Sequence, residues 1–321
     1  MRVLVTGAAG MTGSVLLDYI LENKDELGVE EVWGTHRDRS DMRNVKHIED
    51  KVQWANMELT DAKSVYDTID KIRPDRIFHL GAIAFVPSSW AYPDRVLQVN
   101  TIGTLHMLEA IQRFADNCIF QLAGSSEQYG KVSESELPIT EDQPLRPISP
   151  YGVSKCSADL LTRQYHASYG LKTVVTRSFN HSGARRGEIY VLPQVVKQGI
   201  EISFGKREAF SLGDITARRD FTNAKDIARG YWMTDKCDWG EVYNICSEEM
   251  HSIKEVVDAV AKFCGIDDPK IEQDPTRMRP SDVSVLLGDC TKFKEKTGWE
   301  PEYNFQTTLN EIFNHWSKKY E

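Results

Sequence analysis

The residues best suited to chemistry in this sequence are a tyrosine and a lysine four positions apart. Tyr151 and Lys155 lie in the run SPYGVSK at 149–155, and a spacing of four places two side chains on one face of a helix. A tyrosine hydroxyl, whose pKa is about 10, is a poor base, but a neighbouring ammonium group stabilises the phenolate and lowers that pKa. The pair could therefore move a proton, although such pairs also occur by chance as simple surface contacts.

Hydroxyl and carboxyl side chains lie upstream of this pair, directly after an expected strand. The run GSSE follows an apolar segment and contains Ser125, Ser126 and Glu127. In open α/β folds ligands bind at the carboxyl ends of the strands, which is where this run would lie. We therefore expect these side chains to meet the tyrosine–lysine pair at one site.

Strand-like and helix-like segments alternate through the first half of the chain, which is the pattern of parallel βαβ units. β-rich runs occupy residues 3–6, 31–35, 52–55, 76–80, 118–122 and 173–176, and helical patterns occupy residues 14–22, 61–72, 94–114 and 151–169. This order predicts an α/β fold with a Rossmann-type, doubly wound parallel sheet of six or seven strands, formed by residues 1–177.

The alternation ends near residue 178, and turn-rich, charged stretches follow. They indicate a smaller C-terminal lobe over residues 178–321, packed at the carboxyl ends of the strands, where it would bind the substrate. One more buried strand is expected near 242–246, because Val242–Ile245 is a short apolar run. This strand should return to the sheet, so the two units should interleave in sequence.

Three glycines join the first expected strand to the first expected helix. Gly7, Gly10 and Gly13 form the pattern GxxGxxG, with Met11 and Thr12 inside it. Glycines allow a tight turn and a close approach of the backbone to a pyrophosphate, and the helix N-terminus attracts negative charge. A glycine-rich turn can also be a plain connection, but its place between a strand and a helix favours dinucleotide binding. A nicotinamide held there would move a hydride while the tyrosine–lysine pair moves a proton.

The end of the second expected strand distinguishes NADP from NAD. An acidic residue usually holds the ribose hydroxyls of NAD at this point, whereas this chain has Arg37, Asp38, Arg39 and Ser40. Two guanidinium groups suit a 2′-phosphate, because they make charge-assisted and often bidentate bonds to phosphate. We therefore expect NADP, while Asp38 leaves NAD open and a solvated polar loop is the alternative without function.

Composition narrows the class of protein. The 321 residues carry a net charge of −9, which argues against nucleic acid as a partner, because phosphate backbones are bound by clustered lysine and arginine. No apolar run approaches the roughly 20 residues that span a bilayer. The six cysteines form no Cys-x-x-Cys pair and are expected to be thiols in a reducing cytosol, not metal ligands. We expect a cytoplasmic protein that binds no membrane and no metal.

Further motifs accompany the glycine turn: HLGA at 79–82, VN at 99–100, GSSEQYGK at 124–131 and SPYGVSK at 149–155. Together they resemble the extended short-chain dehydrogenase/reductase family, over essentially the whole chain. More narrowly, two related enzyme families, GDP-mannose 4,6-dehydratase and GDP-4-keto-6-deoxymannose reductase, are similar. The segments that carry this likeness are FNH at 179–181, RRGE at 185–188, LGD at 212–214, RDF at 219–221, RPSDV at 279–283 and LGD at 287–289.

The resemblance to the dehydratase implies a role for each of four residues. Tyr151 would take the proton of the sugar 4-hydroxyl as a hydride passes to NADP, while Lys155 tunes the tyrosine and holds the nicotinamide ribose. Glu127 would take the proton from C5, and Ser125 would help water to leave from C6 before the hydride returns there. Ser125 stands where that family usually has threonine, a change that keeps the hydroxyl group.

The resemblance also implies the remaining binding residues. Cofactor contacts beyond the glycine turn, Arg37 and Arg39 would come from Glu58, Leu59, Leu80, Gly81, Ala82, Asn100, Tyr151 and Lys155. Contacts to a GDP-sugar would come from Ser126, Asn180, Arg185, Arg219 and Arg279, because a buried diphosphate needs compensating donors. The alternatives are surface salt bridges for the arginines and support of the active-site backbone for Asn100. His181 is expected to make structural hydrogen bonds.

Some motifs leave the reaction open between the two families. RRGE at 185–188 matches the dehydratase pattern better, whereas GMTG at 10–13 departs from it and RDFT at 219–222 resembles the reductase. We place a dehydratase first and a reductase or another nucleotide-sugar epimerase second. A non-catalytic Rossmann protein that senses a dinucleotide comes last, because a sensor has no use for a proton relay.

The resemblance extends to assembly. Dehydratases of this kind use arginine-rich loops at a tetramer interface near the cofactor, and this chain has arginines at 37, 39, 185 and 186. A homodimer or homotetramer is therefore expected.

Overall fold

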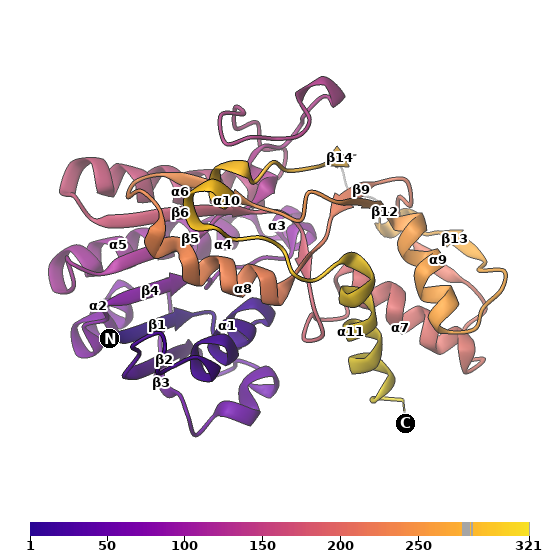
Figure 1. Ribbon diagram of the computed structural model, residues 1–321, viewed down its shortest axis with the longest axis horizontal. Helices are drawn as coiled ribbons and strands as arrows, with labels where there is room; N and C mark the ends of the chain where they lie inside the picture. The colour runs from indigo at the N-terminus through magenta and orange to yellow at the C-terminus, as the bar shows by residue number, and fades with distance from the viewer. Residues whose placement is uncertain (278–282, 284, 321) are drawn as a thin grey trace.

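The chain folds into a seven-stranded parallel sheet covered by helices on both faces, with a smaller lobe at one end (Figure 1). The computed structural model describes residues 1–277, 283 and 285–320. The strand order is β11-β6-β5-β4-β1-β2-β3, and all neighbouring pairs are parallel. These strands are β1 (Arg2–Thr6), β2 (Glu31–His36), β3 (Gln53–Asn56), β4 (Arg76–His79), β5 (Ile119–Ala123), β6 (Lys172–Ser178) and β11 (Val242–Ile245).

β1 lies inside the sheet, between β2 and β4, and is buried on both faces. Val3 and Val5 pack into one hydrophobic core, and Leu4 packs into the other. Strands covered on both faces are continuous apolar runs rather than alternating ones. This explains why the sequence pattern located β1 so closely.

Helices from both halves of the chain cover the sheet. One face carries α2 (Ala62–Ile72), α5 (Gly103–Phe114) and α6 (Pro150–Tyr169), and the other carries α1 (Met11–Glu22), α8 (Ala224–Trp232) and α10 (Thr291–Thr297). α8 packs directly against α1 although about 200 residues separate them in sequence. The second half of the chain therefore helps to hold the helix that begins at the glycine turn.

The helix expected at 94–114 is interrupted by a wider turn. α3 (Val86–Ala91) and α4 (Pro93–Leu97) precede a π-type turn, η2 (Gln98–Ile102), which leads into α5. Such turns are frequent at functional sites. Here the Asn100 side chain accepts a hydrogen bond from the Ile83 amide (2.8 Å) and donates one to Ser154 Oγ (3.0 Å). These tertiary hydrogen bonds stabilise the turn, and helical periodicity alone does not predict them.

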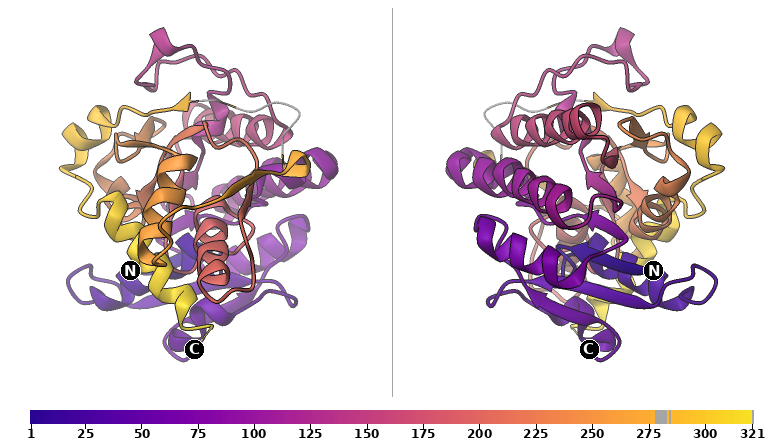
Figure 2. Two further views of the ribbon diagram at one scale, coloured as in Figure 1. Left: turned by 90° about the vertical axis from the view of Figure 1, so that its right-hand side faces the viewer. Right: turned by 90° about the vertical axis from the view of Figure 1, so that its left-hand side faces the viewer.

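The smaller lobe has a hydrophobic core of its own. α7 (Val191–Ser203), α9 (Ile253–Phe263) and α11 (Phe305–Ser317) pack together around it, and Figure 2 shows these three helices facing the viewer in its left panel. Short strands complete the lobe: β7 (His181–Ser182), β8 (Phe210–Leu212), β9 (Arg218–Asp220), β10 (Thr222–Asn223), β12 (Met250–Ser252), β13 (Ile271–Gln273) and β14 (Val285–Leu286). Short 3-10 helices occur in both parts of the chain, at η1 (Arg43–Ile48), η3 (Ser126–Gln128), η4 (Glu134–Glu136), η5 (Met233–Lys236) and η6 (Pro275–Arg277).

The strand expected near 242–246 does return to the sheet. β11 pairs in parallel with β6, with Val242 opposite Val175, and forms the sheet edge. The chain therefore leaves the sheet after β6, enters the lobe, and comes back through α8 and β11 before it completes the lobe. Within the described ranges, none of the helices is both long enough and apolar enough to cross a membrane.

Candidate active site

A large cavity lies where the carboxyl ends of the strands meet the lobe. Its volume is about 1520 Å³, whereas sites for one drug-sized ligand are about 300–1,000 Å³. Most of the predicted site residues line it: Gly7, Gly10, Met11, Thr12, Gly13, Arg37, Arg39, Glu58, Leu59, Leu80, Gly81, Ala82, Ser125, Ser126, Glu127, Tyr151, Lys155, Asn180, Arg185 and Arg219. The structure thus brings together residues from both halves of the chain, in a space large enough for two ligands.

The glycine turn packs so closely that side chains would not fit. Gly7 has a φ of +65°, and a Cβ there would lie 2.8 Å from the amide nitrogen of Gly81. A Cβ on Gly13 would lie 2.4 Å from the carbonyl oxygen of Gly7. The N-cap of α1 is Gly10, which has no side chain to accept from the first amides of the helix. The turn therefore leaves these amides available to an anion, as a pyrophosphate site requires.

Thr12 is tied to the lobe by a histidine. Its Oγ1 lies 3.1 Å from Nε2 of His181, whose Nδ1 lies 2.9 Å from the carbonyl oxygen of Phe179. Burial lowers the pKa of His181 to about 4, so the ring is neutral, donates from Nδ1 and accepts at Nε2. The hydrogen bonds expected for His181 are present, and the residue also lines the cavity.

The loop after β2 presents arginines at the cavity in an exposed setting. Arg37 and Arg39 are both exposed and both line the cavity. The Arg37 amide donates to Ser40 Oγ (2.9 Å), which fixes the loop backbone, and Asp38 accepts a hydrogen bond from Asn56. Two guanidinium groups therefore stand free of this carboxylate at the mouth of the cavity, as recognition of an anion requires.

Tyr151 and Lys155 lie in the first turns of α6 and are both buried, with exposures of 7% and 6%. α6 begins where the sequence predicts, because Ser149 caps it by accepting from the Gly152 amide (3.0 Å) and Pro150 follows. Lys155 Nζ donates to the carbonyl oxygen of Ala123 at the end of β5 (2.7 Å). Burial lowers the pKa of Lys155 to about 8.

The pKa of Tyr151 differs from the sequence-based expectation. Burial raises it above its ordinary value, a hydrogen bond with Ser125 acts in the opposite direction, and the charge of Glu127 raises it further. A cation does act on the phenol, but it is Arg186. The sequence predicted a lowered pKa for Tyr151, whereas in the protein alone the net pKa is raised, because desolvation outweighs the favourable contacts.

Ser125 and Glu127 are set by the short turn η3 at the end of β5. Ser125 is its N-cap: Ser125 Oγ accepts from the Glu127 amide (3.2 Å), and the Ser125 amide donates to Gln128 Oε1 (2.8 Å). This reciprocal pair is a capping box. Both side chains are buried at the cavity, and both influence the pKa of Tyr151. The predicted convergence of these residues with Tyr151 is present.

Of the predicted substrate residues, Ser126 lines the cavity from η3, and the other three described ones differ in their surroundings. Asn180 and Arg219 line the cavity from β6's end and β9, and Asn180 Oδ1 is buried without a hydrogen-bond partner among the described residues. Arg185 also lines the cavity, but its Nη2 pairs with Asp18 of α1 (2.6 Å), which draws it towards the glycine turn. Arg279 lies outside the described residues.

Asn100 is the one described residue among those predicted to bind that does not line the cavity. It is 2% exposed, and its amide brackets Ile83, accepting from the Ile83 amide and donating to the Ile83 carbonyl oxygen (3.2 Å). Asn100 therefore lies outside the cavity lining and supports the backbone of Ile83, which does line the cavity.

Sequence reasoning did not single out several cavity residues as binding groups. Arg186 stacks over the Tyr190 ring, with its guanidinium carbon 3.5 Å from the ring centroid, and acts on Tyr151. Trp316 and Lys319 reach the cavity from the end of α11. The run RRGE pointed to this region, but the sequence could not say which of its two arginines faces the phenol.

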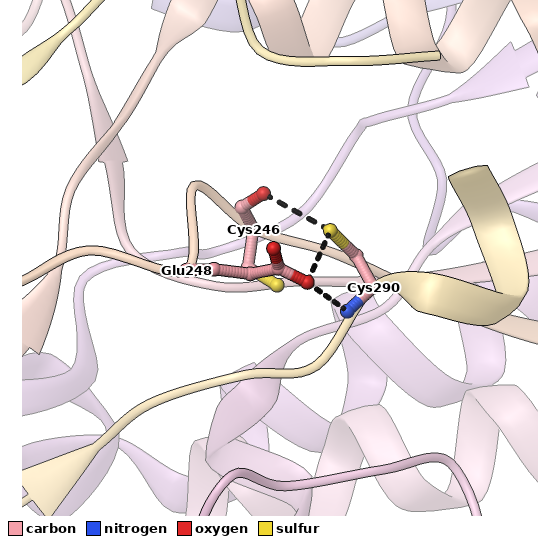
Figure 3. Close-up of side chains that lie close together, drawn as sticks. All are labelled: Cys246, Glu248 and Cys290. Carbon is pink, nitrogen blue, oxygen red and sulfur yellow. Dashed lines mark hydrogen bonds between the residues drawn. The ribbon is translucent and has the colours of Figure 1, made fainter. Parts of the chain in front are cut away.

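A second cluster of chemically capable side chains lies outside the cavity (Figure 3). The ligand atoms of Cys246, Glu248 and Cys290 lie within 4.8 Å of one another. Cys290 Sγ donates to the Cys246 carbonyl oxygen (3.4 Å) and to Glu248 Oε1 (3.3 Å), and Lys294 Nζ donates to Glu248 Oε2 (2.8 Å). The cluster joins the segment after β11 to the start of α10. We assign no metal to it, because Lys294 already neutralises the Glu248 carboxylate.

A family model described as GDP-mannose 4,6 dehydratase matches residues 4–312 of the chain. The chain belongs to the GDP-mannose 4,6-dehydratase family. It is therefore an enzyme of nucleotide-sugar modification, either a lyase of this family or a related reductase. The resemblance to extended short-chain dehydrogenases and the expected fold class are both confirmed.

Relatives of both kinds cover most of the chain. GDP-mannose 4,6 dehydratase of Homo sapiens is 31% identical over 334 residues, which cover 96% of this chain and 89% of the human protein. GDP-6-deoxy-D-mannose reductase of Pseudomonas aeruginosa is 32% identical over 248 residues, which cover 77% of this chain and 81% of the reductase. The solved structure of RMD from Pseudomonas aeruginosa complexed with NADPH is 28% identical, with a TM-score of 0.83 and 99% of each chain covered.

Proposed function

We propose that the protein is an NADP-dependent GDP-mannose 4,6-dehydratase that forms GDP-4-keto-6-deoxymannose and water. The observation that carries the proposal is the convergence of Tyr151, Ser125 and Glu127 at the cavity, where the turn after β5 meets the start of α6. A reductase needs a proton donor at one carbon only, whereas a dehydratase also needs a base for C5 and a group that assists the departure of water from C6. Glu127 and Ser125 can supply these two functions.

The residues present fit a dinucleotide. The glycine turn is a cradle that a Cβ would fill, and the buried Nη1 of Arg185, beside α1, has no hydrogen-bond partner among the described residues. Gly7, Gly10 and Gly13 would hold the pyrophosphate, and Arg37 and Arg39 would hold the 2′-phosphate that distinguishes NADP from NAD. When bound, NADP supplies the hydride acceptor for C4 of the hexose and the hydride donor for C6.

The chain's own residues then handle the protons. With NADP bound, positive charge on the nicotinamide ring and on Lys155 would offset the desolvation that raises the pKa of Tyr151, and Tyr151 Oη would take the proton of the 4-hydroxyl as the phenolate. Glu127 takes the proton from C5, which the new ketone makes acidic, and passes it to the hydroxyl that leaves C6, so that one water is lost. Ser125 Oγ donates a hydrogen bond to the leaving oxygen and so helps it to depart. The proton held by Tyr151 is available for C5 when C6 is reduced, so the sugar loses water with no net oxidation.

The substrate is proposed on polarity as well as on family. Asn180 Oδ1 is a buried acceptor that needs a donor, and sugar hydroxyls are donors. Arg186 and Arg219 bring positive charge to the lobe side of the cavity, which suits a diphosphate. These three residues line the same cavity as Tyr151, Ser125 and Glu127.

The test is to incubate the purified protein with GDP-mannose and substoichiometric NADP and to follow the sugar nucleotide by mass spectrometry. We expect a product lighter by one water, in excess over NADP, with no accumulation of NADPH. UDP-glucose serves as the control substrate and should give none of the dehydrated product. Failure of GDP-mannose to react would contradict the proposal.

A reductase of GDP-4-keto-6-deoxymannose is the second candidate. It is favoured by the motif RDFT at 219–222 and by the solved RMD structure, which covers 99% of each chain, whereas sequence coverage of this chain is larger for the human dehydratase (96%) than for the reductase (77%). The two candidates separate in the Glu127→Gln variant. A dehydratase should lose turnover of GDP-mannose, whereas a reductase should consume NADPH in proportion to the keto-sugar with or without Glu127.

A further inference from the structure

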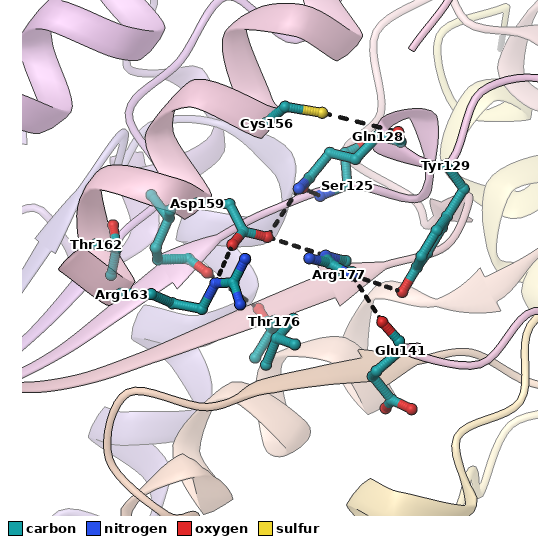
Figure 4. A network of polar contacts seen from close by, with 12 residues as sticks. Ser125, Gln128, Tyr129, Glu141, Cys156, Asp159, Thr162, Arg163, Thr176 and Arg177 are labelled. Atoms are coloured by element: carbon teal, nitrogen blue, oxygen red, sulfur yellow. Dashed lines mark hydrogen bonds and ion pairs between the residues drawn. The ribbon is translucent and has the colours of Figure 1, made fainter. Parts of the chain in front are cut away.

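The buried side-chain amide of Gln128 connects the turn η3 with helix α6, the two elements that carry the reacting groups (Figure 4). The Ser125 amide donates to Gln128 Oε1 (2.8 Å), and Gln128 Nε2 donates to Asp159 Oδ2 (2.8 Å). Gln128 and Asp159 are both fully buried. The two ends of one side chain therefore make one hydrogen bond to the β5–η3 turn and one to α6.

Asp159 lies on the same face of α6 as Tyr151 and Lys155. Asp159 follows Lys155 by four residues, one turn further along α6, and Lys155 follows Tyr151 by four. These residues are therefore successive on one stripe of the helix. Gln128 links Ser125 and Glu127 on the turn to the stripe that carries Tyr151 and Lys155.

The carboxylate of Asp159 is itself held in place. Arg177 of β6 is 2% exposed, and its Nε donates to Asp159 Oδ2 (2.9 Å). Arg177 Nη1 donates in turn to the Tyr129 hydroxyl (3.2 Å), which donates to Asn244 Oδ1 of β11 (2.6 Å). A buried, paired carboxylate with these contacts is a fixed point rather than a mobile acceptor.

The amide also has little room to move. A Cβ on Gly124 would lie 2.8 Å from Gln128 Oε1 and 2.8 Å from the carbonyl oxygen of Thr176. The Gly124 amide donates to that same carbonyl (2.7 Å). Gln128 is therefore packed against the backbone that leads into the turn.

We propose that Gln128 is a positioning residue, which sets Ser125 and Glu127 relative to Tyr151 and Lys155 through its hydrogen bond to Asp159. This inference rests on the proposed function, in which these four side chains act on one sugar ring. Reacting groups must be held to within about 0.5 Å of their productive geometry, and a 1 Å displacement can lower a rate by roughly 100-fold. Gln128 touches neither substrate nor cofactor in this role.

The principal variant is Gln128→Met, which keeps the length of the side chain but removes both hydrogen bonds. We expect kcat to fall about 10- to 100-fold, with KM for GDP-mannose and Kd for NADP within about twofold of the wild type. Arg163→Ala is the matched control. Arg163 donates to the other oxygen of Asp159 (2.9 Å) from a half-exposed position and does not touch the turn, so its loss should leave kcat within about twofold.

Gln128→Glu provides an independent readout. As the neutral acid it can donate to Asp159 and accept from the Ser125 amide, but as the carboxylate it can only accept and it repels Asp159. The kcat of this variant, relative to wild type, should therefore fall as pH rises and the new carboxyl ionises. The ionisable groups around this position are Asp159 and Arg177 at the side chain, Cys156 at the backbone carbonyl, and Glu127 and Tyr129 as chain neighbours.

Failure of this inference can be told apart from failure of the proposed function. A kcat within twofold of wild type in Gln128→Met, or a ratio for Gln128→Glu that does not change with pH, overturns the positioning role. If the wild type converts neither GDP-mannose nor the keto-sugar, the proposed function fails, and hydrogen–deuterium exchange of residues 123–130 decides about the network. Faster exchange in Gln128→Met than in Arg163→Ala supports it, and equal exchange overturns it.

Discussion

The two ends of the cavity hold their charged groups in opposite ways. At the catalytic end, Tyr151 and Lys155 are less than a tenth exposed, and hydrogen bonds to Ser125 and Ala123 fix their positions. At the end formed by the loop after β2, Arg37 and Arg39 are exposed to solvent. Burial sets the pKa of a group that handles protons. Groups that only recognise a charged phosphate need no such setting, and their side chains can close on the ligand.

The catalytic end differs in a second respect, because its supports come from several distant segments. The turn η3, the helix α6 and the strands β6 and β11 all contribute to the hydrogen bonds beneath Ser125. The loop after β2 is held by contacts within itself and to the neighbouring strand β3, such as Arg37 with Ser40 and Asp38 with Asn56. We therefore expect changes at the catalytic end to lower rates, and changes at the other end to weaken binding.

The largest effect is expected for Tyr151→Phe. Removal of the hydroxyl removes the group that moves the 4-hydroxyl proton, so kcat should fall roughly 100- to 10,000-fold. Binding of NADP, followed by titration calorimetry, should stay within about twofold, because the glycine turn and the arginines are intact. Comparable turnover in the variant and the wild type would remove Tyr151 from the mechanism and erase the contrast between the two ends.

An intermediate effect is expected when both arginines of the β2 loop are replaced. The Arg37→Ala, Arg39→Ala double variant should bind NADP about 10- to 100-fold more weakly, since a charge-assisted hydrogen bond to phosphate is lost at each exposed arginine and solvent screens part of its strength. NAD, which lacks the 2′-phosphate, is the internal control, and its Kd should change by less than about threefold. Equal losses of affinity for NADP and NAD would mean that these arginines do not bind the 2′-phosphate.

The smallest effect concerns stability and pH at Lys155. Its pKa is about 8 in the folded protein and 10.5 ordinarily, so between these values the unfolded chain binds more protons than the folded chain. Stability contributed by this group therefore rises with pH in that window. In Lys155→Met this gain is absent, so the free energy of unfolding of wild type relative to the variant should increase between pH 8 and 10, by on the order of 2 kcal/mol.

The control for this comparison is Lys63→Met. Lys63 is an exposed lysine of α2 whose hydrogen bond to Asp67, one turn away, raises its pKa rather than lowering it. Chemical denaturation at several pH values measures the difference for each variant. Parallel curves for wild type and Lys155→Met would contradict the lowered pKa.

Much of the fold could be predicted because many of its elements depend on residues that are close together in the sequence. The apolar runs of β1 and β11 and the Ser149–Pro150 start of α6 each depend on a few neighbouring residues, and each was located to within one residue or two. The π-type turn at Gln98–Ile102 was missed, because it depends on hydrogen bonds from Asn100 to residues 17 and 54 positions away. Helical periodicity carries no information about such contacts.

The candidate site shows the same division. The motifs around the glycine turn, Ser125 and Tyr151 named side chains that do line one cavity. They could not tell that Arg185 pairs with Asp18 while its neighbour Arg186 acts on Tyr151. Adjacent residues outside regular structure can point in different directions, and only their tertiary partners decide which direction each takes.

The sequence by itself determined the family, the order of the parallel strands along the chain, and which types of side chain are present for proton transfer and phosphate recognition. These follow from spacing and from local backbone preference. Only the tertiary structure decided the raised pKa of Tyr151, the lowered pKa of Lys155 and the place of Gln128 between the two catalytic elements. Burial and long-range hydrogen bonds control these properties, and both arise from residues that meet only when the chain has folded.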